Sequence, residues 1–238
     1  MKFLYYLTAI GNPDINQKIQ ILIDNLNYIY NTINSNFDIV INCYDNSLDV
    51  VKFAVKKLFF IDSVMCHQQS GMLSEVWLTN PHNVVAMSSH YDYVLFILDD
   101  VEIKYLDINE MIKVKVANSI KIISPKVSNA FHSYMHTSEP ENSLILTNRL
   151  ELFCYLMTPA DFAKYATMNS IENKYMWGVD ILFGPLNVKT AIYNKFEVVH
   201  RLSSTNGGDD AMQLSLNLLR KYGFNSYDEI YSKYPCIV

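Results

Sequence analysis

Apolar runs and helical patterns alternate along the first part of the chain. Residues 2–9 and 37–43 are almost continuously apolar, which is typical of strands covered on both faces in a parallel sheet. Between them, apolar residues recur at helical spacing: Ile15, Ile19, Leu22, Ile23, Leu26 and Ile29. This spacing predicts a helix that Asp14 caps. Residues 48–58 predict a short second helix, and residues 59–65 a third strand.

The alternation continues to a fourth strand. Ser70 and Gly71 open a predicted helix that reaches Trp77, and the Asn80-Pro81 pair begins another, because proline is favoured at the first helical position. Residues 93–98 are again an unbroken apolar run. The order predicts an α/β fold: a single Rossmann-like domain with a mainly parallel central sheet flanked by helices. Its ligand crevice should lie at the carboxyl ends of the strands.

Further elements are predicted in the second half of the chain. They are a strand at 120–124, a helix at 158–168 that starts at Thr158-Pro159, a strand ending at 197–200, and a helix at 211–222 that follows Asp209 and Asp210. No Pro/Gly/Ser-rich linker and no internal repeat interrupts the chain. Residues 1–238 are therefore interpreted as one domain, with halves at 1–103 and 104–238.

Composition and charge exclude several classes of protein. Half of the residues are hydrophobic and 18% are charged, which favours a folded core over disorder. A net charge of −5 without a run of Lys or Arg argues against nucleic acid as a partner. The cysteines form no CxxC pair. Because the chain shows neither a signal-peptide pattern nor an apolar stretch long enough to span a bilayer, we expect a cytoplasmic protein without a transmembrane segment.

Three carboxylates end the apolar run at residues 93–98. Asp99, Asp100 and Glu102 lie within four positions of one another. Carboxylates are costly to desolvate and repel one another, so they need either open water or a shared cation. Oxygen ligands of this kind suit Mg²⁺ or Mn²⁺. The cluster is thus either a solvated strand end or a metal site in the predicted crevice.

Three segments together resemble the GT-A fold of nucleotide-sugar glycosyltransferases. The chain has neither a GxGxxG nor a GxxxxGK[ST] loop, which disfavours dehydrogenases and P-loop proteins. "LDDVE" at 98–102 resembles the DxD-type motif of that family, "YMWGVD" at 175–180 its W-G-x-[DE] segment, and "FEVVH" at 196–200 its late strand with a terminal histidine. The resemblance covers roughly residues 1–205 and is nearest to small viral and bacterial glycosyltransferase domains. For a virus-encoded protein the compartment would be the host cytoplasm.

This resemblance implies roles for residues around the metal and the acceptor. Asp100, Glu102 and His200 would bind Mn²⁺ or Mg²⁺, and Asp180 would be the general base of an inverting transfer. Trp177 and Gly178 would contact the acceptor, which is a glycan or another hydroxyl compound. His200 could also be a structural residue, Trp177 a core aromatic, and Asp180 a helix cap.

The resemblance also implies a donor site in residues 1–103, with the acceptor site in 104–238. The residues expected to bind the nucleotide sugar lie after the strands: Thr8, Ala9, Asp45, Gly71 and Asp99. A carboxylate near the base favours a UDP-sugar, although Asp45 could be an ordinary turn residue. The family often has a basic residue near Gly71, where this chain offers only His67.

Two other classes of protein also fit an acidic strand end. A Mg²⁺-dependent phosphohydrolase or nucleotidyltransferase uses carboxylates in the same way, but the first strand lacks the DxDx[TV] motif common in such hydrolases. A binding module without activity is expected to have a broken acidic motif, and this one is intact.

Overall fold

The computed structural model describes residues 1–33, 36–58, 64–70, 73–75, 90–135, 139–141, 143–202 and 208–236. In these residues the strands form one sheet in the order β3-β2-β1-β4-β8-β6-β9-β5, with β7 also paired to β9. The strands are β1 (Lys2–Ile10), β2 (Asn36–Cys43), β3 (Val64–Gln68), β4 (Tyr93–Ile97), β5 (Val101–Tyr105), β6 (Ile122–Ser128), β7 (Leu144–Thr147), β8 (Cys154–Met157) and β9 (Thr190–His200).

Most of the described strands run in one direction. β1 to β4 are parallel, and β6 and β9 share their direction because β8 is antiparallel to both β4 and β6. β5, β7 and β8 run the opposite way. The prediction of an α/β fold with a mainly parallel sheet is thus confirmed, and the antiparallel strands all follow β4 in the chain.

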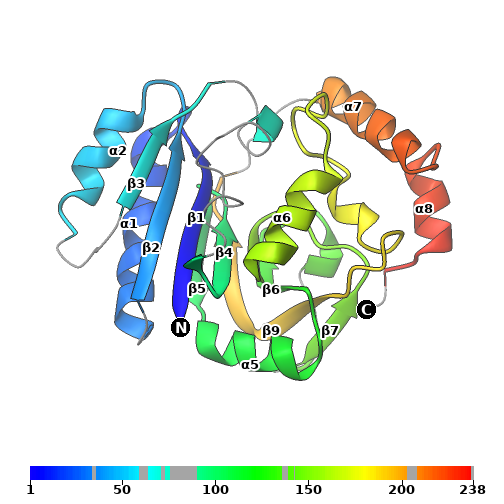
Figure 1. The fold of residues 1–238 in the computed structure, drawn as a ribbon, viewed down its shortest axis with the longest axis horizontal. Helices are drawn as coiled ribbons and strands as arrows, with labels where there is room; N and C mark the ends of the chain where they lie inside the picture. Colours follow the sequence, from blue (N-terminus) through cyan, green and yellow to red (C-terminus); the bar gives the residue numbers. More distant parts are fainter. Residues whose placement is uncertain are drawn as a thin grey trace.

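Helices cover both faces of the sheet. They are α1 (Ile15–Thr32), α2 (Leu48–Val55), α5 (Ile108–Ala117), α6 (Pro159–Met168), α7 (Gly208–Lys221) and α8 (Tyr227–Lys233), with 3-10 turns η2 (Ser133–Met135) and η3 (Asp180–Leu182). Neighbouring residues of a strand point to opposite faces. Accordingly Tyr6 packs against Phe162 of α6, with ring centroids 5.3 Å apart, while Tyr5 interacts with Asn25 of α1. Figure 1 shows α6 in front of the sheet and α1 behind it.

Side chains of α1 bond the outer edge of β5. The Nδ2 of Asn25 donates to the carbonyl of Val101 at 2.8 Å, and the N–H of Ile103 donates to Oδ1 of Asn25 at 2.8 Å. The N–H of Leu106 donates to the hydroxyl of Tyr28 at 3.0 Å. Asn25 is 1% exposed, and both the nitrogen and the oxygen of its buried side-chain amide bond the backbone of β5. The bonds fix the strand that follows the acidic turn.

Several predicted elements need correction. Asp14 precedes α1 but makes no side-chain cap bond, and its φ of 64° is left-handed. Thr158 does cap α6, since its hydroxyl accepts from the N–H of Asp161 at 3.1 Å. The strand at 120–124 lies at 122–128, and the helix at 211–222 already begins at Gly208. No pattern predicted β5, α5, β7, β8 or α8.

Some predicted elements fall outside the described residues. Of the strand at 59–65, residues 64 and 65 are described and belong to β3. Of the helices predicted from Ser70 and from the Asn80-Pro81 pair, the structure describes residues 70 and 73–75, the latter helical. Gly71 and Trp77 lie outside it.

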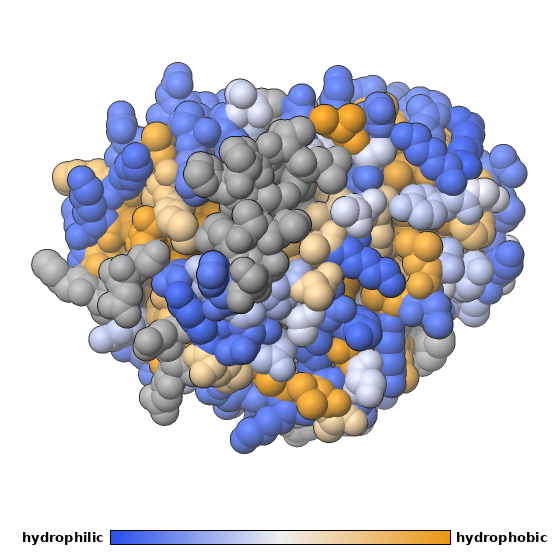
Figure 2. Space-filling view, in the orientation of Figure 1, coloured by the Kyte–Doolittle hydropathy of each residue, from blue (hydrophilic) through white to orange (hydrophobic). Residues whose placement is uncertain are grey.

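The described surface mixes polar and apolar side chains. On the face in Figure 2, apolar groups lie dispersed between hydrophilic ones over both ends of the molecule. Large exposed apolar side chains include Phe53 on α2 and Phe131 after β6, at 65% and 64% exposure. In the described residues no helix is long and apolar enough to cross a membrane.

Candidate functional site

The acidic cluster forms a tight turn between β4 and β5. The N–H of Val101 donates to the carbonyl of Leu98 at 3.4 Å, which places Asp99 and Asp100 at the centre of the turn, where aspartate is favoured. Two more backbone bonds anchor it: Leu98 to Phe153 before β8, at 3.1 Å, and Arg201 after β9 to Asp100, at 2.8 Å. The turn therefore lies where the ends of β4 and β9 meet.

Asp99 is held by a lysine of α1. The Nζ of Lys18 lies 2.9 Å from Oδ2 of Asp99 and 3.2 Å from the carbonyl of Gly11. Burial raises the pKa of Asp99 to about 6, against the opposing charge of Lys18. Lys18 thus places a buried cation beside the predicted donor site.

Asp100 and His200 form the centre of the candidate site. The Nε2 of His200 lies 3.0 Å from Oδ2 of Asp100, and its Nδ1 lies 3.4 Å from the carbonyl of Asn129. The ring packs on Phe153 with centroids 4.9 Å apart. Burial alone would lower the pKa of His200, but the hydrogen bond with Asp100, the charge of Asp100, the contact with the Asn129 backbone and the charge of Glu151 together raise that pKa. Within the described residues, Oδ1 of Asp100 is buried and has no hydrogen-bond partner.

Glu102 points to other partners. It lies in β5, where its two carboxylate oxygens pair with Lys104 and Arg201. Burial opposes ionisation, but these hydrogen bonds prevail and lower the pKa of Glu102. In the described part of the chain no group of three metal-binding side chains is present. The structure therefore brings together Asp100 and His200 of the predicted metal ligands and places Glu102 in ion pairs.

Three of the predicted donor residues, Thr8, Ala9 and Asp45, lie at the ends of β1 and β2. Thr8 and Ala9 belong to β1 near its carboxyl end. Asp45 is exposed in the turn after β2, and a methyl group on Gly11 would lie 3.1 Å from its Oδ2 and 2.9 Å from Cβ of Tyr44. Glycine at position 11 thus allows this turn to close on the end of β1.

The segment at 175–180 is fixed by its backbone. Gly178 has a φ of 81°, and a Cβ there would lie 3.3 Å from Cβ of Ser215, so glycine is required. The Nδ2 of Asn173 donates to the carbonyl of Trp177 at 2.9 Å and to Oδ1 of Asn169 at 2.7 Å. Trp177 itself is half-buried. These contacts set the direction in which the chain enters η3 at Asp180.

Asp180 lies among tyrosines. Burial raises its pKa to about 6, while backbone hydrogen bonds at the start of η3 and the charge of Arg149 oppose the shift. Burial raises the pKa of five tyrosines in the described residues, and the negative charge of Asp180 adds to the shift in each: Tyr134, Tyr155, Tyr165, Tyr227 and Tyr231. Such a carboxyl group can hold or release a proton near neutral pH, as a general base must.

Sequence patterns missed Lys18 and Glu151. Burial, and then the charge of Asp180, raise the pKa of Glu151 to about 7, and His200 also acts on it. Glu151 is therefore near enough to Asp180 and His200 to interact with both electrostatically. The run "RLELF" carries no motif that could have indicated it. For Lys18 a signal existed, because it lies on the apolar stripe of α1 between Ile15 and Leu22.

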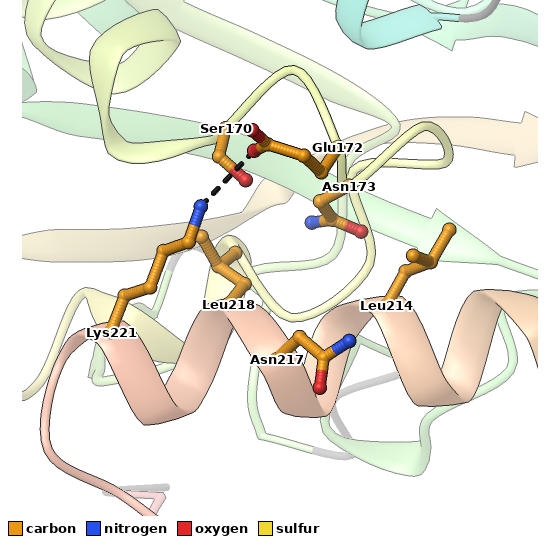
Figure 3. A pocket seen from close by; sticks show the side chains of 7 residues that line it. All are labelled: Ser170, Glu172, Asn173, Leu214, Asn217, Leu218 and Lys221. Atoms are coloured by element: carbon orange, nitrogen blue, oxygen red, sulfur yellow. Dashed lines mark hydrogen bonds and ion pairs between the residues drawn. The ribbon is translucent and has the colours of Figure 1, made fainter.

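A separate pocket lies beside α7. It has a volume of about 330 Å³ and lies between α7 and residues 170–173, and Lys221 pairs there with Glu172 at 3.0 Å (Figure 3). The lining residues are Ser170, Glu172, Asn173, Leu214, Asn217, Leu218 and Lys221. None of the predicted site residues lines it, so it is distinct from the Asp100–His200 site.

Comparison with known proteins supports the fold. No family model and no curated protein sequence matches the chain. It superposes on the crystal structure of GalNAc-T7 with UDP, GalNAc and Mn²⁺ with a TM-score of 0.61 and 8% identity, over 99% of this chain and 51% of that one. On S. aureus TarS 1-349 in complex with UDP-GlcNAc, the TM-score is 0.61 and the identity 13%, over 98% of this chain and 71% of TarS 1-349. The chain thus spans about half of the GalNAc-T7 chain. It has the GT-A fold of glycosyltransferases, as predicted.

Proposed function

We propose that the chain is a metal-dependent glycosyltransferase that moves a sugar from a nucleotide-sugar donor, with a UDP-sugar favoured, to a hydroxyl acceptor. The observation that carries this proposal is the Asp100–His200 pair at the meeting point of β4 and β9, with one buried carboxylate oxygen unpartnered among the described residues. In an α/β sheet, ligands bind outside the carboxyl ends of the strands.

The pair fits a divalent cation. A buried oxygen without a partner is costly unless a ligand or ion completes it, and a carboxylate with an imidazole suits Mn²⁺ or Mg²⁺. Asp100 and His200 would hold the ion, and oxygens of the donor diphosphate would take further positions, as is usual for Mg²⁺. When bound, the ion stabilises charge that develops on the leaving diphosphate. Both carboxylate oxygens of Glu102 are already paired, with Lys104 and Arg201.

The remaining residues divide between donor and acceptor. Asp45, beside the end of β1, would accept a hydrogen bond from the base, and Thr8, Ala9 and Gly71 would complete the donor site. Lys18 holds Asp99 beside it. The UDP bound in the GalNAc-T7 structure and the UDP-GlcNAc bound in the TarS structure support a UDP-sugar as donor.

On the acceptor side, Asp180 would take the proton of the attacking hydroxyl. A pKa of about 6 leaves it ionised at neutral pH yet basic enough to receive that proton. Attack from the face opposite the leaving group makes the transfer inverting. Trp177 and Gly178, which precede Asp180 in the chain, would contact the acceptor.

The test is a screen of UDP- and GDP-sugars for binding and turnover, with and without Mn²⁺, on the wild type and Asp100→Ala. Metal-dependent binding or slow hydrolysis of one donor, lost in the variant, is expected. Phosphate release without any sugar-nucleotide preference would instead indicate a phosphohydrolase. If no nucleotide sugar binds, the proposal is wrong.

A further inference from the structure

A short loop connects the candidate metal site to the candidate base. This loop, residues 129–135, follows β6, and its first carbonyl, that of Asn129, contacts Nδ1 of His200 at 3.4 Å. Near its end, burial and then the charges of Asp180 and Glu151 raise the pKa of Tyr134, so these carboxyl groups lie near that ring. The 129–135 loop therefore contacts His200 at one end and lies near Asp180 and Glu151 at the other.

The 129–135 loop presents aromatic faces to solvent. Phe131 is 64% exposed, and the side chain of His132 is 54% exposed. The His132 ring stacks on Tyr134 with centroids 5.3 Å apart and planes 9° apart. Exposing a phenylalanine costs burial free energy of about 1.5 to 3 kcal/mol, and a loop could have avoided that cost with a polar residue. Aromatic rings beside a polar site are typical of ligand-binding surfaces.

Glu151 supplies unused hydrogen-bonding capacity beside these rings. In the described residues its carboxylate is approached by the N–H and the Nε2 of His132, both at 3.4 Å, which is long for a hydrogen bond. Burial lowers the pKa of His132, so that ring does not neutralise Glu151 near pH 7. The carboxyl group is thus available to a ligand.

We propose that the 129–135 loop and Glu151 form a carbohydrate subsite for the acceptor. Phe131 stacks against the apolar face of a sugar ring, and Glu151 hydrogen-bonds one of its hydroxyls. The inference rests on the proposed function and deepens it, because it names the acceptor as a sugar.

The side chains of the 129–135 loop and Glu151 favour a neutral sugar over other hydroxyl compounds. A pyranose has an apolar C–H face for an aromatic ring and hydroxyls at its rim for a carboxylate. Asp180, and Glu151 when it is ionised, carry negative charge that disfavours an anionic acceptor. Because the pKa of Glu151 is about 7, its carboxyl group both accepts and donates hydrogen bonds at neutral pH.

The experiment compares Phe131→Ala and Glu151→Gln with the control Phe53→Ala. Phe53 lies on α2 with 65% exposure, so it matches Phe131 in residue type and exposure but lies outside the site. The acceptors are a panel of methyl glycosides and disaccharides, with glycerol and a serine peptide as non-sugar hydroxyls. Binding of UDP with Mg²⁺ is titrated in parallel by calorimetry, as is binding of the accepted sugar to the UDP-loaded protein.

We expect a sugar to be accepted and its KM and Kd to rise about tenfold in Phe131→Ala, as for the loss of an aromatic contact. Glu151→Gln should raise both by a similar factor, and Phe53→Ala should change neither. The affinity for UDP should be retained in all three variants. If metal-dependent UDP binding is intact but Phe131→Ala matches Phe53→Ala, or only non-sugar hydroxyls react, the inference alone is overturned. If the wild type binds no UDP or UDP-sugar, the proposed function fails and the inference with it.

Discussion

Nε2 of His200 lies 3.0 Å from Oδ2 of Asp100, although the two residues are 100 positions apart in the chain. β9 pairs with β5 so that His200 lies opposite Val101, directly after the acidic turn. The contact between His200 and Asp100 therefore depends on the pairing of β9 with β5 and not on residues that are neighbours in the chain.

Asp100→Asn and His200→Ala should each weaken Mn²⁺-dependent binding of UDP by about tenfold or more, as for lost metal contacts. Glu102→Gln should weaken it by less, because its carboxylate is occupied by Lys104 and Arg201. Calorimetric titration of UDP at fixed Mn²⁺ measures the three affinities. An equal loss in Glu102→Gln would show that Glu102 is a ligand after all.

Asp180→Asn should make the protein more stable and less active. Its pKa rises from the ordinary 3.8 to about 6, so between these values the native state binds more protons than the unfolded state. The free energy of unfolding therefore falls as the pH rises through this window. Removing the group should add on the order of 1 to 3 kcal/mol at pH 8 and nothing near pH 3.

Thermal unfolding at both pH values measures this effect, with an expected rise in Tm of roughly 2 to 8 °C at pH 8. Transfer should fall by about 100-fold or more if Asp180 is the base. A lower Tm at pH 8 would contradict the destabilising role of this carboxylate.

Lys18→Met should destabilise the protein by about 3 to 5 kcal/mol, because it leaves Asp99 buried without its partner. Both side chains are little exposed, at 11% and 17%. The double variant Lys18→Met/Asp99→Asn leaves neither charge unpaired, so its loss should be smaller than that of Lys18→Met alone. Urea unfolding of the single and double variants gives the comparison, and simple additivity would argue against a coupled pair.

Asn25→Ala should cost about 2 to 4 kcal/mol of unfolding free energy, because it leaves the carbonyl of Val101 and the N–H of Ile103 buried without partners. Asn31→Ala is the matched control, since Asn31 is exposed on the same helix. Urea unfolding measures both. Similar losses in the two variants would mean that the bonds to β5 contribute little.

Local patterns predicted what depends on neighbours in the chain. The strands β1, β2 and β4 and the cap of α6 at Thr158 follow from hydrophobic periodicity and capping chemistry, and the structure has them. The roles of Asp100, His200 and Asp180 came from a family likeness, and the structure places the first two in contact.

Distant pairing could not be predicted in the same way. Residues 101–105, "VEIKY", form β5 only because β9 pairs with them from positions 197–200. That pairing also turns Glu102 toward Arg201, which no local pattern shows. The pKa of Glu151 is raised by burial and then by the charge of Asp180, a residue brought near by folding. The ion pair of Glu102 and the raised pKa of Glu151 therefore arise only when the chain is folded.

The side chains of α1 on β5 also govern how copies of this protein can associate. A terminal strand usually offers its backbone groups to another molecule, which can add a strand and start aggregation. Here Asn25 and Tyr28 already bond Val101, Ile103 and Leu106. A second molecule could extend the sheet at β5 only by displacing these side chains of α1, so this end of the described sheet is protected against strand addition.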